Sequence, residues 1–263
     1  MIFPKKIALV GVPWDKKSSY LQGSALAPGR IREALHCGSA NYWTELGKNP
    51  FDQDFIDFQN LEIQTYFDIE HQFDAILQKN VRTLSLGGDH SITFPIIKAQ
   101  HKLWKDFDIL QIDAHGDLYH DFEGDPHAHA CPFARIMENK LSSRLIQVGI
   151  RSLNPHQRNQ IAKFGVETIE MYQFDSGIRP KLDKPVYISL DLDGLDPAYA
   201  PGVSHHEPGG LTTREVLRLI QSIEVPIIGA DIVELNPHRD VSNMTAMVAA
   251  KLLKEIVGKM KEL

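Results

Sequence analysis

The sequence has few cysteines and no long apolar segment, and each scarcity excludes a class of protein. Its two cysteines, Cys37 and Cys131, lie far apart and do not form the disulfide framework of a small secreted domain. No segment approaches the roughly 18 apolar residues that a membrane span requires. Residues 1–10 contain a short apolar run without a cleavage-like site, which predicts a first strand rather than a signal peptide. We therefore expect a cytoplasmic protein that does not act on a membrane.

Positive charge is also scarce. The chain has 28 Lys and Arg against 34 Asp and Glu, a net charge of −6, and no basic cluster. Such a balance argues against a nucleic-acid partner or an anionic membrane surface. Internal repeats, low-complexity tracts and linkers are absent as well, so we expect residues 1–263 to form a single domain. Hydrophobic residues make up 43% of the chain, which is enough for a sizeable core.

Short apolar segments alternate with helical patterns along nearly the whole chain. The expected strands are Lys6–Gly11, Val81–Leu86, Ile109–Asp113, Leu145–Gly149, Val166–Ile169, Val186–Asp191 and Pro226–Asp231, with a weaker one at Phe55–Leu61. They are apolar on consecutive residues, which is typical of parallel strands buried on both faces. Helices are expected at Arg30–Leu35, after Ser91, at Val216–Ile220 and at Ala246–Met260. This alternation predicts an α/β fold, a three-layer αβα sandwich around a mostly parallel sheet of about eight strands.

Acidic and imidazole side chains gather where these apolar segments stop. The four clusters are Gly87-Gly88-Asp89-His90, Asp113-Ala-His115-Gly-Asp117, Asp191-Leu-Asp193, and the segment from Asp231 to Glu234. Function collects at the carboxyl ends of parallel strands. Alternate residues of an extended chain point the same way, so Asp113, His115 and Asp117 are expected to share a face. Carboxylates that face one cleft repel unless cations neutralise them, so the sequence predicts a two-metal hydrolase.

Each cluster alone has a simpler interpretation, but their joint occurrence argues against it. Residues 87–91 could be a glycine turn with Ser91 as a helix cap. Cys131, two residues from His129, raises the alternative of a thiolate nucleophile, although a small buried side chain suits it better. Arg151 and Arg158 are expected to be surface or subunit-contact charges. Roles stay open for three histidines: His127, His205 and His206.

With these motifs in this order, the chain resembles the ureohydrolases, the family of arginases, agmatinases and related guanidino-acid hydrolases. The motifs that carry the resemblance are residues 87–91 (GGDHS), 113–117 (DAHGD), 189–197 (SLDLDGLDP) and 231–237 (DIVELNP), and the likeness covers nearly the whole chain. It implies an arginase-like fold, two manganese ions per subunit and a homo-oligomer, either a trimer or a hexamer. The implied metal ligands are His90, Asp113, His115, Asp117, Asp191 and Asp193, with Asp113 and Asp191 as bridges. Hard oxygen donors with imidazole fit manganese, and the spacing leaves nickel, cobalt and zinc open.

The same resemblance implies hydrolysis of a guanidino group to urea and an amine. Two cations that share a water lower its pKa, so that hydroxide is available near neutral pH, and Asp117 would orient it. His129 corresponds to the family's proton shuttle, and Glu234 to the carboxylate that binds the planar guanidinium. The family often has glycine after this histidine, whereas this chain has Ala130, so His127 stays a second candidate.

The loop before His129 bears on the substrate. Acidic residues Asp121, Glu123 and Asp125 stand where arginases typically have a loop rich in Thr, Ser and Asn. Acidic charge attracts an amine, so we expect agmatine, a substrate of polyamine metabolism, with Asp121 and Glu123 binding its tail. A solvated acidic loop is the simpler alternative. Arginine, guanidinobutyrate and formiminoglutamate stay open as substrates, as does a non-catalytic, metal-binding member of the family.

Overall fold

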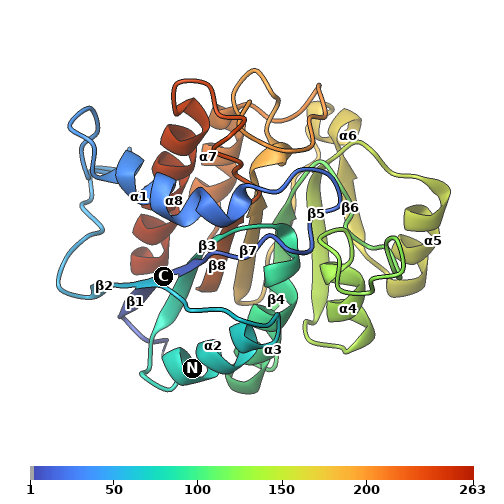
Figure 1. Ribbon diagram of the computed structural model, residues 1–263, viewed down its shortest axis with the longest axis horizontal. Helices are drawn as coiled ribbons and strands as arrows, with labels where there is room; N and C mark the ends of the chain where they lie inside the picture. Colours follow the sequence, from blue (N-terminus) through green and yellow to red (C-terminus); the bar gives the residue numbers. More distant parts are fainter. Residues whose placement is uncertain (1–2) are drawn as a thin grey trace.

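Eight strands form one parallel sheet in the computed structural model, which describes residues 3–263 (Figure 1). They are β1 (Ile7–Val12), β2 (Phe55–Asn60), β3 (Arg82–Gly87), β4 (Asp108–Ile112), β5 (Arg144–Ile150), β6 (Glu167–Glu170), β7 (Val186–Asp191) and β8 (Ile227–Val233). Their order across the sheet is β2-β1-β3-β8-β7-β4-β5-β6, and the paired strands run parallel. All eight expected strands are confirmed, with ends that differ by one or two residues at most.

Helices cover both faces of the sheet and create two hydrophobic cores. One layer contains α1 (Ala27–Leu35), α6 (Met171–Asp175), α7 (Thr213–Gln221) and α8 (Met244–Glu262), and the other contains α2 (Asp68–Leu77), α3 (Thr93–Leu103), α4 (Pro132–Glu138) and α5 (Pro155–Phe164). Along β1, Ile7 and Leu9 enter the first core, whereas Ala8 and Val10 enter the second. Burying one Leu or Ile side chain contributes about 1.5–3 kcal/mol. The expected three-layer αβα sandwich is therefore confirmed.

The turn between β3 and α3 places the first histidine of the predicted site. A short 3-10 turn, η2 (His90–Ile92), leads into α3, and the carboxylate of Asp89 accepts the Ser91 backbone N–H at 3.1 Å. The expected cap was Ser91, but its hydroxyl instead donates to Asp89. Asp89 is the better cap because its carboxylate carries two acceptor oxygens and a negative charge at the start of the turn. His90 is thereby fixed at the end of β3.

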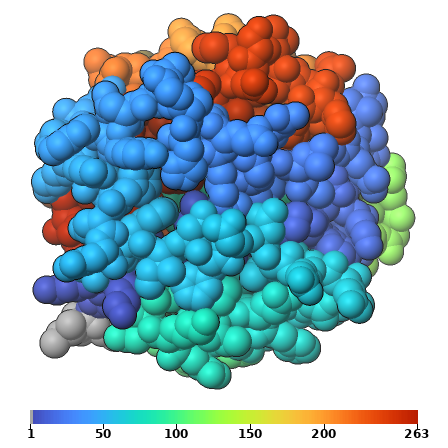
Figure 2. Space-filling model, turned by 60° about the vertical axis from the view of Figure 1, so that its left-hand side comes forward, coloured from blue at the N-terminus to red at the C-terminus, as the bar shows by residue number. Residues whose placement is uncertain are grey.

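The segment between β1 and β2 crosses the outside of the sheet. Figure 2 shows the early part of the chain, blue to cyan, spread over this face, with the C-terminal residues in red at its upper edge. Residues 15–23 of this segment, here called the N-terminal loop, contact the loops at the carboxyl ends of the strands. The carbonyl of Leu21 accepts from the Ser204 hydroxyl at 3.1 Å, and that of Gln22 accepts from the Asn236 amide at 3.2 Å. These bonds hold the N-terminal loop beside the predicted site.

Candidate metal centre and active site

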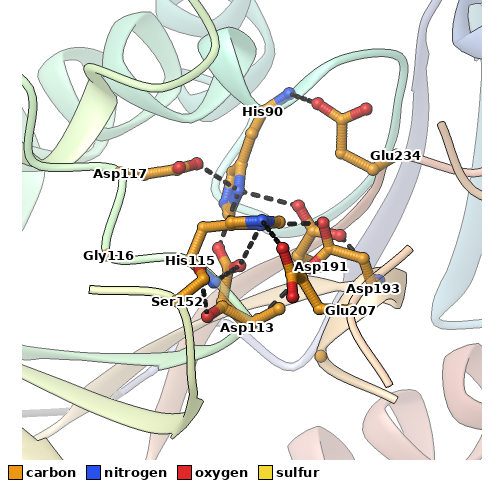
Figure 3. A network of polar contacts seen from close by, with 12 residues as sticks. His90, Asp113, His115, Gly116, Asp117, Ser152, Asp191, Asp193, Glu207 and Glu234 are labelled. Atoms are coloured by element: carbon orange, nitrogen blue, oxygen red, sulfur yellow. Dashed lines mark hydrogen bonds and ion pairs between the residues drawn. The ribbon is translucent and has the colours of Figure 1, made fainter. Parts of the chain in front are cut away.

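The four polar motifs meet at one edge of the sheet (Figure 3). They follow β3, β4, β7 and β8, which are neighbours in the order β3-β8-β7-β4. Parallel strands end at the same edge, so the side chains that follow them lie close together. The motifs therefore meet as expected, at the carboxyl ends of the four strands in the middle of the sheet.

Loop geometry, rather than strand alternation, brings the side chains after β4 together. β4 ends at Ile112, so Asp113 and the residues after it are not extended strand. The carboxylate of Asp113 accepts the His115 backbone N–H at 2.6 Å and the Gln111 amide at 2.7 Å. Asp117 has a φ of 47°, a left-handed conformation that costs a non-glycine residue about 1–2 kcal/mol. The side chains converge as expected, but the reason given for it, alternation along an extended strand, is wrong.

The first candidate metal group surrounds the imidazole of His90. Its Nδ1 lies 3.2 Å from Asp113 Oδ2, and 3.1 Å from Oδ2 of both Asp117 and Asp191. His90, Asp113 and Asp117 lie close enough to hold one metal ion. His90 Nδ1 is buried without a hydrogen bond. A ring nitrogen that faces three carboxylates in this way fits a position on a cation.

The second group is built around His115. Its Nδ1 lies 3.0 Å from Asp193 Oδ2 and 3.7 Å from Asp113 Oδ1. Asp113, His115 and Asp193 also lie close enough to hold one ion. Asp113 belongs to both groups, with one oxygen directed to each histidine. This sharing fits a pair of metal ions bridged by a carboxylate.

A buried network on β7 and α3 sets the proton on the His90 ring. Ser189 Oγ donates to Asp231 Oδ1 at 2.7 Å, so its oxygen accepts from His90 Nε2 at 2.9 Å. Tyr187 and Thr93 donate to the other oxygen of Asp231, both at 2.9 Å. A hydrogen bond from Nε2 leaves the Nδ1 lone pair available to a cation, the usual arrangement of a metal-binding histidine. Asp231 thus supports the site from behind.

The charges of the site are expensive to bury together. Burial raises the pKa of Asp113 to about 7, with help from the charges of Asp117 and Asp193. Burial, Asp193 and Asp113 raise the pKa of Asp191 well above its usual range. Burial lowers the pKa of His90, but the carboxylates that face its ring raise this pKa by more than burial lowers it, so the pKa lies above its usual range. Without cations, the raised pKa values mean that the cluster retains protons. Divalent cations would neutralise the carboxylates in place of these protons, so the donor set fits two such ions.

His129 and Glu234 form a second polar pair beside the candidate metal groups. His129 Nδ1 lies 3.3 Å from Glu234 Oε1, and that oxygen also accepts the backbone N–H of His90 at 2.8 Å. Glu234 has a φ of 65°, which turns its side chain back toward the site at the end of β8. Burial lowers the pKa of His129, but Glu234 raises it, to about 9. The pair places a proton donor next to a buried carboxylate.

The other candidates in the His129 loop face away from the site. The ring of His127 stacks on Phe94 at 5.6 Å and packs edge-on against Phe67. Cys131 is fully buried and its thiol donates weakly to the Asp125 carbonyl. Burial raises the pKa of Cys131 to about 12. Only His129 of these three lines the cavity described below, which favours it as the proton shuttle.

We expect Cys131→Ser to retain most of the enzyme's activity. The thiol is protonated at neutral pH because of its raised pKa, so it supplies no nucleophile. The measurement is the rate of urea release with metal bound, together with a repeat after the metal has been removed with a chelator. Activity that is lost in Cys131→Ser but survives the chelator in the unaltered protein would favour a thiolate mechanism.

A cavity of about 230 Å³ opens onto both metal groups. Its walls include His115, Asp117, Asp191, Asp193, His129, Glu234, Tyr119, Ser152, Gln157, Glu207, Ser19 and His205. Asp121 and Glu123 are exposed and are not among the residues that line it. Asp125 instead pairs with Lys17 at 2.5 Å. Binding of a substrate tail by Asp121 and Glu123 stays a prediction that this geometry does not favour.

Several residues of the site carried no recognisable signal in the sequence. Arg151 was expected to be a surface or subunit-contact charge, but its guanidinium donates to the carbonyls of Asp193 and Glu207 at 2.7 and 2.5 Å. It therefore holds together the loops that carry the candidate metal ligands. Arg158, in contrast, is an exposed partner of Glu170. The open histidines separate as well. His205 stacks on His129, with ring centroids 5.2 Å apart. His206 instead hydrogen-bonds to the Pro201 carbonyl, outside the cavity.

Comparisons with known proteins agree with this geometry. The model of the Arginase family matches residues 5–258. An arginase of Medicago truncatula is 47% identical over 97% of this chain and 82% of its own length, and an agmatinase of Bacillus subtilis is 35% identical over 95% and 90%. The solved structure of arginase from Medicago truncatula has a TM-score of 0.89 and 43% identity, covering 97% of this chain and 87% of that one.

The names of the relatives correct one expectation. The Medicago arginase and two arginases of Arabidopsis thaliana are named as mitochondrial or chloroplastic proteins. These names contradict the expected cytoplasmic location. The expectation was wrong because unpaired cysteines indicate a reducing environment and do not distinguish one such compartment from another. Within residues 3–263, no helix is both long and apolar enough to cross a membrane.

Proposed function

The chain belongs to the arginase family, and on this premise we propose that it hydrolyses arginine to urea and ornithine. As a member of that family it is a hydrolase that acts on guanidino C–N bonds. The choice of arginine rather than agmatine is supported first by similarity. Named arginases reach 47% identity, whereas the agmatinase of Bacillus subtilis is at 35%.

The far wall of the cavity also supports arginine. Tyr119 accepts a hydrogen bond from Asn154 at 2.6 Å, so its own O–H proton can be donated to a carboxylate. Ser152 donates to the Ala114 carbonyl, so its oxygen is left to accept from an ammonium group. Together with Glu207, these groups suit the carboxylate and ammonium of an amino acid. Agmatine lacks that carboxylate, and the acidic side chains that were expected to attract its tail lie outside the cavity.

The chain's own donors would hold two manganese ions. His90 and Asp117 would bind one ion, His115 and Asp193 the other, with Asp113 and Asp191 between them. When bound, the pair supplies ionised water near neutral pH as the nucleophile. The donor set supports this assignment because both histidines present a ring nitrogen to buried carboxylates.

Three side chains would then bind and protonate the substrate. The buried carboxylate of Glu234 pairs with the planar guanidinium, which is best recognised by a bidentate, charge-assisted contact. Asp117 accepts a hydrogen bond from the attacking oxygen and orients it toward the central carbon. His129, bonded to Glu234 through Nδ1, lies beside the bound guanidinium and gives a proton to the departing amine nitrogen. The attacking oxygen forms a C–O bond to the central carbon, the C–N bond breaks as that N–H bond forms, and the O–H proton passes to the Asp117 carboxylate, so that urea remains.

We expect arginine to exceed agmatine in kcat/KM by about 10- to 100-fold, because one or two hydrogen bonds to its carboxylate contribute about 1.5–3 kcal/mol. The measurement is urea release by the manganese-loaded protein from arginine, agmatine and guanidinobutyrate, and hydrolysis of formiminoglutamate in parallel. A preference for agmatine would replace arginine by the substrate first expected from the sequence. Failure to release urea from any guanidino compound, with two metal ions confirmed bound, would contradict the enzymatic proposal altogether.

We further propose that the protein is a homo-oligomer, as the resemblance implied. Sedimentation of the metal-loaded protein would distinguish a trimer, a hexamer and a monomer.

A non-catalytic role for the metal centre is the other candidate function. The His129–Glu234 pair argues against it, since neither side chain is needed to hold an ion.

A further inference from the structure

The imidazole of His129 is held at both of its nitrogens. Its Nδ1 faces the buried Glu234, while its Nε2 lies 2.8 Å from the hydroxyl oxygen of Ser19. The side chain of His129 is only 12% exposed, whereas Ser19 is an exposed residue and lines the cavity. The ring therefore lies between the buried carboxylate of Glu234, on one side, and the solvent-facing hydroxyl of Ser19, on the other.

The backbone holds Ser19 in this position. The carbonyl of Lys17 accepts the backbone N–H of His129 at 3.1 Å, and the backbone N–H of Lys17 donates to Asp89 at 3.0 Å. The ammonium of Lys17 also pairs with Asp125, in the loop that carries His129. The N-terminal loop is thus joined to the His129 loop through both main chain and side chains. Such anchoring pre-organises the hydroxyl for one ring nitrogen.

We propose that Ser19 is a positioning residue that fixes the ring of His129 and carries protons between its Nε2 and bulk water. The proposal rests on the proposed function, in which His129 gives a proton to the amine and must regain one. A hydroxyl can donate and accept at the same time. When Nε2 has given up its proton and Nδ1 keeps its own beside Glu234, a water molecule passes a proton to the Ser19 oxygen as the Ser19 proton passes to Nε2. One O–H bond of water and one of Ser19 break while a new O–H bond on Ser19 and an N–H bond on His129 form. Hydroxide is left in bulk water, and Ser19 ends unchanged.

The surroundings of His129 explain why a path to solvent is needed. Burial lowers its pKa, while Glu234 and the charges of Asp117 and Asp89 raise it, to about 9. His205 stacks on the ring and is half-buried, and this partial burial lowers the pKa of His205. Of these acidic groups, Glu234 faces Nδ1, on the inner side of the ring. Ser19 is the hydrogen-bonding partner on the outer side among the residues that the structure describes.

The test compares Ser19→Ala with Ser19→Thr and with Ser18→Ala in the manganese-loaded protein. Ser18 is the matched control, since its hydroxyl faces Asp89 at 3.4 Å rather than His129. With the substrate that the unaltered protein turns over, we expect Ser19→Ala to lower kcat by about 10- to 100-fold with little change in KM. This effect is smaller than the ~10²–10⁴-fold contributed by a general acid or base itself, because His129 remains in place. Millimolar imidazole should restore part of the rate by replacing the lost hydroxyl. Ser19→Thr, which keeps the hydroxyl, and Ser18→Ala should stay close to the unaltered protein.

A second readout does not depend on turnover. In the metal-free protein, the ¹⁵N resonance of His129 Nε2 should move in Ser19→Ala and stay in place in Ser18→Ala. An unchanged resonance, or equal kcat values for Ser19→Ala and Ser18→Ala, would overturn the proposal. A loss of rate that imidazole does not restore would also overturn it, because Ser19 would then only pack the loop. If the unaltered protein proves inactive on every guanidino compound, the proposed function fails, while the resonance still reports whether Ser19 holds His129.

Discussion

Asp191→Asn should abolish activity and leave the protein folded. Asp191 Oδ1 accepts the backbone N–H of Asp193 at 2.8 Å, a bond that the asparagine oxygen can keep. Its Oδ2, 3.1 Å from His90 Nδ1, would become an N–H₂ group, which donates to that nitrogen and cannot bind a cation. Losing a shared ligand removes several kcal/mol of transition-state stabilisation. We therefore expect urea release to fall at least ~10³-fold.

Metal stoichiometry distinguishes this loss from unfolding. Elemental analysis should give two manganese ions per chain before the change, and one or none after it. The metal-free variant should melt at the same temperature as the metal-free parent or higher, because one buried like charge has been removed. Asp196→Asn is the matched control from the same motif, since Asp196 binds the Gly209 backbone instead. Two ions still bound in Asp191→Asn, with activity within tenfold, would remove Asp191 from the metal centre.

Glu234→Gln should lower kcat/KM by about 10²–10⁴-fold while both metal ions remain bound. A buried carboxylate that loses its charge no longer compensates a buried guanidinium, a loss of about 3–5 kcal/mol. The glutamine oxygen can still accept the backbone N–H of His90, which is 2.8 Å from Glu234 Oε1. The turn at the start of α3 should therefore survive. Steady-state kinetics with arginine and a metal determination on the same sample measure the two quantities.

Glu207→Gln provides the comparison for Glu234→Gln. Its carboxylate also lines the cavity but is 40% exposed, and exposed charge pairs contribute about 0–1 kcal/mol. We expect kcat/KM to fall less than tenfold in this variant. Equal effects of the two substitutions would show that general negative charge in the cavity, rather than a specific guanidinium contact, accounts for binding by Glu234.

The fold could be predicted because its strands are marked by local pattern. Strand β7 was expected at Val186–Asp191 and lies there, since a run of consecutive apolar residues ends at an acid. Helix α5 was not predicted, because its sequence is mostly polar and its buried residues include Gln157 and Gln160. Helix α4 is only seven residues long, too short for a helical repeat of apolar residues to be recognised in its sequence. That the chain forms a single domain stays a prediction.

The site could be predicted where its residues form short motifs at the ends of expected strands. Asp113, His115 and Asp117 form a motif within five residues, and the structure brings them to the candidate metal groups. The contact between Ser19 and His129 joins positions 110 residues apart, so no local spacing reveals it. The orientation of the acidic loop could not be predicted for a related reason. Its composition gives its charge but not whether its side chains face the cavity or the solvent.

The origin of the cavity walls has an evolutionary consequence. The proposed metal ligands come from the ends of three central strands and Glu234 from the end of a fourth, whereas Ser19, Tyr119 and Glu207 come from connecting loops. Strand ends are locked by the packing of both cores, so they resist change, while loops tolerate insertion and replacement. A gene that drifts in its loops can therefore exchange one amidine for another without rebuilding the reaction centre. Diversification of this scaffold is cheapest at its periphery, and the chemistry at its centre is inherited intact.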